Sequence, residues 1–138
     1  MSRRLATVLR VTALQEKVAR GAAGGTLAAQ ERARLAHLDA VAAVASAGAL
    51  QTGTGAELAE AADGRALRAL AAVAARGDLR TAQGERQAAL ARWNEAQRRK
   101  RLFEELQART LEAERAKAEK VAQALADDLS AARARAGK

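Results

Sequence analysis

The residues of this 138-residue chain that could do chemistry include two pairs of neighbouring carboxylates, Glu104–Glu105 and Asp127–Asp128. Paired carboxylates act as general acid and base when both converge on one substrate. Both pairs lie in a stretch whose composition predicts a helix, where adjacent side chains diverge by about 100° around the axis. We therefore do not expect either pair to direct both carboxyl groups at one bound molecule.

Other catalytic and ligand-binding constellations are missing from the sequence. The chain has one histidine, His37, and no cysteine, which excludes a histidine cluster, a thiolate nucleophile and a cysteine metal site. We expect His37 to be an ordinary helix-surface residue. The run Gly21–Gly25 lacks the Lys-Ser/Thr ending and the preceding strand of a phosphate-binding loop. The sequence predicts no enzyme activity, no catalytic residue, no cofactor and no metal.

The densest group of candidate binding residues is a basic run next to apolar and aromatic side chains. Arginine and aromatic residues are frequent anchors of protein interfaces. The candidate partner-binding residues are Trp93, Arg98, Arg99, Lys100, Arg101, Leu102, Phe103 and Leu106. Two plainer interpretations stay open: the basic run is a solvated helix face, and the two aromatic residues pack in a seam between helices.

The element that must position these residues is a long helix. The chain has no proline, and 52 residues from Glu85 to Ala136 contain no glycine. Ala, Leu, Glu, Gln, Arg and Lys dominate this stretch and have high helix propensities. A continuous helix of this length spans about 78 Å at about 1.5 Å per residue. A chain of this size cannot wrap it, so we expect it to pair with a second helix along part of its length.

Composition favours an all-α fold with a thin core. Apolar residues make up 49% of the chain, but 41 residues are alanine and none is isoleucine. One Trp, one Phe and no Tyr could not supply the usual pattern of β-strands. We predict a single domain over residues 1–138, folded as a long two-helix antiparallel coiled-coil hairpin with unequal arms.

A glycine-rich loop divides the two predicted arms. Residues 46–55 hold three glycines and three hydroxyl residues. We predict helix one over about 3–47, the loop over about 48–55 and helix two over about 56–135. Thr54 can cap helix two, with Glu57 as its capping-box partner. Because helix two is much longer, its carboxyl-terminal end must overhang helix one, fray or bind something else.

Glycines predict weak points in both arms, because each costs up to about 1 kcal/mol in a helix interior. We expect Gly21–Gly25 to kink or split helix one. Gly64, Gly77 and Gly84 lie in helix two, so we expect that helix to be firm only after about Gly84.

Apolar residues follow an imperfect heptad pattern. The first arm carries its larger apolar groups on a broad stripe that resumes after the glycines: Leu5, Val8, Leu9, Val11, Leu14, Val18, then Leu27, Leu35, Leu38, Val41 and Val44. In the second arm Leu111, Ala118, Leu125 and Ala132 recur every seven residues, but the residues before them follow another register. Such shifts locally unwind a coiled coil, so we expect a loosely wound, alanine-rich pair.

The chain is strongly basic, with 24 Lys and Arg residues, 16 acidic residues and a net charge of +8. Such an excess favours acidic partners, nucleic acid or an anionic membrane surface. The abundance of Ala, Arg and Gly is also typical of a simple compositional bias. From Glu85 onward 13 basic and 9 acidic residues are interspersed, which disfavours a nucleic-acid-reading helix.

One stretch resembles a known family. Residues 95–115 hold the basic pair Arg99–Lys100, a leucine step from Leu102 to Leu106, and Arg109 followed by mixed charges. This order resembles the carboxyl-terminal helix of FliJ, the coiled-coil protein of the flagellar type III export apparatus. Asp127–Asp128 and the amphipathic start over residues 3–11 are similar to the family as well. Residues 20–84 lack its glutamate and leucine density.

The resemblance implies a two-helix antiparallel coiled coil similar to the central stalk of rotary ATPases. Such a protein inserts into the ring of the export ATPase FliI, touches the export gate FlhA and escorts export chaperones, without hydrolysing ATP itself. It would couple ATP hydrolysis to export of flagellar proteins. The implied location is the bacterial cytoplasm, with peripheral association at the inner membrane through these partners.

Two alternatives stay open beside this function. One is a generic coiled-coil scaffold or a stalk subunit of another ATPase, and the other is a basic nucleic-acid-binding rod. No window of about 18 consecutive apolar residues occurs, so we expect no transmembrane helix. Charged residues interrupt the apolar segment after Arg3–Arg4, and we expect no export signal there.

Overall fold

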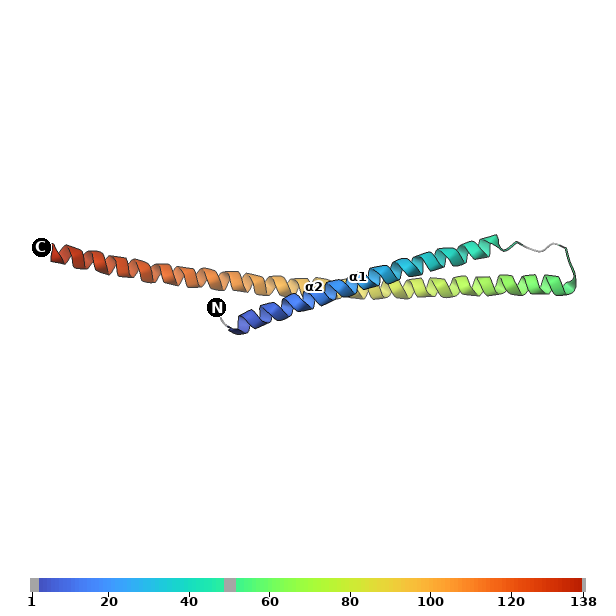
Figure 1. Cartoon of the computed structure of the whole chain (residues 1–138), viewed down its shortest axis with the longest axis horizontal. Helices are drawn as coiled ribbons and strands as arrows, with labels where there is room; N and C mark the ends of the chain where they lie inside the picture. The colour runs from blue at the N-terminus through green and yellow to red at the C-terminus, as the bar shows by residue number, and fades with distance from the viewer. Residues whose placement is uncertain (1–2, 49–51, 138) are drawn as a thin grey trace. The chain divides into compact units, whose positions relative to one another are not determined.

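The computed structural model describes residues 3–48 and 52–137, which form two helices (Figure 1). Helix α1 runs over Arg3–Ser46 with 44 residues, and helix α2 runs over Gly55–Ala136 with 82 residues. The two helices pack against each other, and no strand occurs in the described ranges. This arrangement confirms the predicted all-α hairpin with unequal arms. Of the predicted loop, residues 49–51 lie outside the described residues.

The start of α2 is fixed by a capping box. The Glu57 backbone N–H donates to the Thr54 hydroxyl at 3.2 Å, and the Thr54 backbone N–H donates to the Glu57 carboxylate at 3.3 Å. Two donors that have no partner within the helix are thereby satisfied. Just before this cap, Gly53 has a φ of 153°, a conformation that side chains with a Cβ rarely adopt. The predicted cap is confirmed. The positive φ at position 53 explains why a glycine stands next to the cap.

Both helices continue through their interior glycines, so Gly21–Gly25 do not split helix one, and lower firmness of α2 before Gly84 stays a prediction. Helix α1 is unbroken from Arg3 to Ser46, and α2 is helical from Gly55 onward. Each glycine costs at most about 1 kcal/mol, and the alanine-rich sequence on both sides supplies many residues of the best propensity. Helix formation is cooperative, so scattered single glycines do not end either helix.

The fold divides into two units, one of residues 17–95 and one that joins residues 3–16 to residues 96–137. In the first unit, the buried and half-buried positions advance by alternating steps of three and four residues, the heptad period of a coiled coil. On α1 these inward positions are Ala19, Ala23, Thr26, Gln30, Ala33, His37 and Ala40. On α2 they include Ala72, Ala75, Leu79, Ala82, Arg86, Ala89 and Trp93. The seam is therefore built largely from alanine, as predicted.

In the second unit the inward line continues with more polar residues. Thr12 and Glu16 of α1 are buried, and the Thr12 hydroxyl donates to the Leu9 carbonyl at 3.0 Å. The half-buried positions on α2 include Ala96, Lys100, Phe103, Gln107 and Thr110. From residue 111 to residue 137 every described residue is exposed. The carboxyl-terminal part of α2 thus overhangs its partner, the first of the three predicted outcomes, and it stays helical to Ala136.

The larger apolar side chains lie mostly outside the seam, which differs from what the apolar stripe of the first arm suggested. Leu5, Val8 and Leu9 are half-buried, but the rest of that stripe is exposed, with Val18 at 72%. The spacing explains this: Leu35, Leu38, Val41 and Val44 follow at steps of three, so each lies about 60° behind the last around the helix. They cannot all face one partner helix, whereas the alanines keep a single period.

We expect the double substitution Gly21→Ala with Gly25→Ala to raise the free energy of unfolding by about 1–2 kcal/mol. No heavy atom lies within 4 Å of a Cβ built at either glycine, so the methyl groups meet open space while the unfolded chain loses freedom. Denaturant unfolding followed by circular dichroism at 222 nm measures the change.

The matched control is Gly53→Ala, which we expect to lower stability because the backbone there has a positive φ. Destabilisation by the helix double substitution would contradict an unbroken α1.

Candidate functional site

Burial divides the predicted binding residues of α2 into two sets. Lys100 and Phe103 are half-buried on the inward face. Residues three and four apart share a face of a helix, and the outward set has that spacing. It consists of Arg98, Arg99, Leu102 and Leu106, all exposed, with Leu102 at 54% and Leu106 at 41%. We call this set the basic–apolar face. Arg101 is also exposed.

Trp93 belongs to the other unit and faces α1. It lines a shallow hollow with Ala23, Gly24 and Leu27 of α1 and with Leu90 of α2. Arg20 of α1 and Arg86 of α2 complete the lining. The structure therefore places Trp93 in the seam, one of the two interpretations that the sequence left open. Phe103, also half-buried, lies on the equivalent face of α2 in its own unit.

A buried carboxylate lies beside the inward half of the basic run. Glu16 is 6% exposed and lines a hollow with Gln97, Lys100 and Arg101. A carboxylate taken from water needs cations or donors near it, and two basic side chains supply them. The ammonium of Lys100 also lies 4.0 Å from the Glu104 carboxylate. Lys100 and Arg101 thus contribute charge where α1 and α2 meet within this unit.

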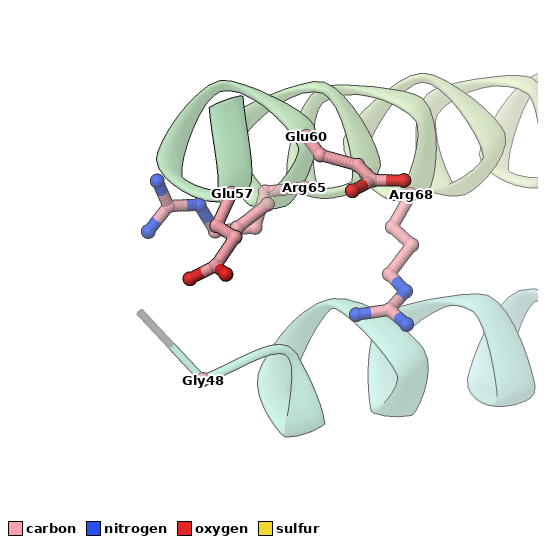
Figure 2. Close-up of a pocket in the computed structure, with 7 residues that line it drawn as sticks. Gly48, Glu57, Glu60, Arg65 and Arg68 are labelled. Atoms are coloured by element: carbon pink, nitrogen blue, oxygen red, sulfur yellow. The ribbon is translucent and has the colours of Figure 1, made fainter. Parts of the chain in front are cut away.

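The helix ends near the turn form an open hollow of mixed charge (Figure 2). Figure 2 shows Glu57, Glu60, Arg65 and Arg68 on the first turns of α2, with Arg68 extending toward the end of α1. Glu57 already serves as the helix cap. Acidic and basic side chains share this surface, which gives no concentrated site for an anion or a cation.

His37 is a correction to the sequence interpretation, because it is half-buried on the seam and not on the helix surface. Its Nδ1 atom is buried and has no hydrogen-bond partner. The spacing could have revealed this: position 37 continues the three–four alternation of Ala23, Gln30 and Ala33. Glu16 lies on the same alternation, and sequence reasoning missed it because a glutamate is seldom expected inside.

The carboxylates that could do chemistry do not converge. Glu104, Glu105, Asp127 and Asp128 are all exposed on α2. No group of three or more metal-ligating side chains occurs in the described ranges 3–48 and 52–137. The described residues offer helix surfaces for binding.

The exposed pair Glu31–Arg34 illustrates the surface electrostatics of α1. The Arg34 Nε–H donates to both Glu31 carboxylate oxygens, at 3.2 and 3.1 Å. This hydrogen bond lowers the pKa of the Glu31 carboxyl, and the same contact raises the pKa of Arg34. Both groups are fully exposed, so water screens the pair and it contributes little to stability.

No protein-family model matches this chain, and no curated protein or solved structure gives a significant match to it. Among the described residues, neither helix has an apolar stretch long enough to cross a membrane.

We expect His37→Leu to raise the free energy of unfolding by about 1 kcal/mol, because a buried ring nitrogen without a partner is replaced by apolar carbon. Thermal and denaturant unfolding at pH 8 measure the difference. The control is Leu38→His at the neighbouring, 50% exposed position, where we expect a change within about 0.5 kcal/mol. A stability loss in the His37 variant would show that the nitrogen has a partner in solution.

Proposed function

We propose that this chain is a non-catalytic coupling factor that binds other proteins along its helices, as a FliJ-like component of the flagellar export apparatus. The observation that carries the proposal is the unequal hairpin: α2 has 82 residues and α1 has 44, and α2 is exposed from residue 111 onward. Such a hairpin presents long continuous helix surfaces, and no group of three or more metal-ligating side chains occurs among the described residues.

The basic–apolar face supports a protein partner. Arg98 and Arg99 lie beside Leu102 and Leu106 on the outward side of α2. Leucine exposed next to arginine combines an apolar anchor with charge complementarity, and both favour a specific protein surface. A partner with acidic residues around an apolar groove matches this face.

The flagellar export ATPase is the proposed partner for this face, and the export gate and export chaperones are proposed as further partners. The sequence resemblance over residues 95–115 supports this choice, since that segment contains the whole basic–apolar face. In this function the chain does not hydrolyse ATP and instead links the ATPase to export.

We expect the double substitution Leu102→Asp with Leu106→Asp to weaken binding to a purified flagellar export ATPase at least about tenfold, which corresponds to about 1.4 kcal/mol. Two exposed apolar anchors are lost, while the inward residues Lys100 and Phe103 are untouched. Pull-down followed by titration with a labelled chain measures the affinity, and circular dichroism verifies the helix content.

The matched control is Leu67→Asp with Leu70→Asp, two leucines of similar chemistry at 67% and 65% exposure elsewhere on α2. We expect this control to bind the ATPase as tightly as the wild-type chain. Failure of the wild-type chain to bind any export ATPase, together with salt-sensitive retention on DNA, would sink the proposed function and favour nucleic-acid binding.

A further inference from the structure

The exposed end of α2 carries an apolar stripe with a regular heptad period. Leu111, Ala118, Leu125 and Ala132 recur every seven residues. A second series begins four residues after Leu111, with Arg115, Ala122, Leu129 and Ala136. The two series alternate steps of four and three, as the a and d positions of a coiled coil do. We call these eight positions the terminal stripe, and all of them are exposed, with Leu125 at 59% and Leu129 at 61%.

The terminal stripe does not continue the line by which α2 faces α1. The inward line of this unit passes through Lys100, Phe103, Gln107 and Thr110. Its continuation in steps of four and three passes through residues 114, 117, 121, 124, 128, 131 and 135, four of which are charged. Each position of the terminal stripe lies one residue after a position of this continued inward line. The stripe is therefore rotated by about 100° around the helix axis from the inward line. Its apolar residues are therefore aligned for a partner other than α1.

We propose that the terminal stripe binds the same stripe of a second copy of this chain, in antiparallel orientation, so that the protein forms a homodimer. With the twofold axis between residues 123 and 124, Leu125 lies opposite Ala122 of the second copy. In the same register, Leu129 lies opposite Ala118 and Leu111 lies opposite Ala136. Each leucine meets an alanine, which fills the seam evenly without crowding or cavities. Arg115 lies opposite Ala132, where its aliphatic stem can pack while its charge reaches water.

The charges beside the stripe are complementary in this register. In an antiparallel pair of helices the flanking e positions face each other, and so do the g positions. Glu112 then faces Arg133 of the second copy, and Glu114 faces Arg135 of the second copy. Symmetry gives each pair twice, so four ion pairs flank the seam, and all four residues are exposed on the single chain. Complementary charges at these positions set the orientation and choice of partner.

A parallel pairing of the same stripes has mixed electrostatics, because Asp128 meets Arg133 of the second copy but like charges meet at two other places. It places Arg115 against Arg115 of the second copy within the seam, where two like charges repel. It also brings Glu114 next to Glu119 of the second copy, because parallel helices pair g positions with the following e positions. The sequence thus distinguishes the two orientations and favours the antiparallel one. The proposal uses residues 111–136 and does not depend on the export ATPase as a partner.

The first test is the mass of the wild-type chain by sedimentation equilibrium. We expect a dimer that dissociates on dilution, with a dissociation constant in the range of about 1–100 µM. A chain that stays monomeric at about 500 µM would overturn the proposal, because the apolar seam would then be too weak to hold two copies.

The second test exchanges the charges. We expect Arg133→Glu with Arg135→Glu to weaken the homodimer at least about tenfold, and Glu112→Arg with Glu114→Arg to do the same, because each leaves only like charges across the seam. Mixing the two variants restores pairing, since every flanking pair is again opposite in sign. The control is Lys117→Glu with Lys120→Glu, which changes the net charge as the two arginine substitutions do but lies away from the seam. This control should dimerise like the wild-type chain.

The third test measures orientation with spin labels, which is straightforward because the chain has no cysteine. Ala113→Cys and Ala134→Cys lie on the outer side of the segment, equally far from the proposed twofold axis. Two labels at residue 113 should lie about 32 Å apart along the axis, since 21 residues at about 1.5 Å each separate 113 from 134. Labels at 113 on one copy and 134 on the other should be much closer.

Two results would refute the antiparallel dimer. Labels at residue 113 that lie close together would indicate a parallel pair. Charge variants that each dimerise as tightly as the wild-type chain would show that another surface joins the two copies.

Discussion

The contact on which the fold depends is an alanine seam with one strict period. In the unit of residues 17–95, Ala23, Ala82 and Ala89 are the most buried residues, at 4%, 9% and 3% exposure. Alanine buries little area, but it loses no side-chain entropy and has the best helix propensity. The seam holds the helices together through many small contacts at regular intervals. Most of the larger apolar residues therefore lie outside the seam and are exposed on the surface of the helices.

Much of this architecture follows from the sequence. The absence of proline, the alanine content and the 46–55 loop predict two helices whose bounds agree with the structure within one residue. The capping box is visible in Thr54 and Glu57 because the chemistry of a cap is local. Which face turns inward was harder to predict, because large apolar residues such as Leu35 and Leu38 dominate the apparent stripe. Because these residues follow one another at steps of three, they wind around the helix and do not stay on one face. The alanines keep one face and form the contact between the helices.

For the candidate binding residues, too, the sequence did not show which side chains face the other helix. The basic residues 98–101 are consecutive in the sequence, but successive side chains of a helix point about 100° apart. Lys100 is therefore half-buried near Glu16, while Arg98 and Arg99 face outward with Leu102. Part of the run lies where α1 and α2 meet, and the other part is exposed. The glycines at 21–25 also do not split α1, because helix formation is cooperative along a whole segment.

The alanine seam of residues 17–95 has a consequence for the register of the two helices. A uniform row of alanines would fit equally well after α1 slid along α2 by one heptad, about 10 Å. The inward line is not uniform, because Gln30 and His37 on α1 and Leu79, Arg86 and Trp93 on α2 interrupt the alanines. Each of these side chains stands at one place along its helix, so a slip would give it a different neighbour. These larger and polar residues therefore define the register that alanine alone leaves open.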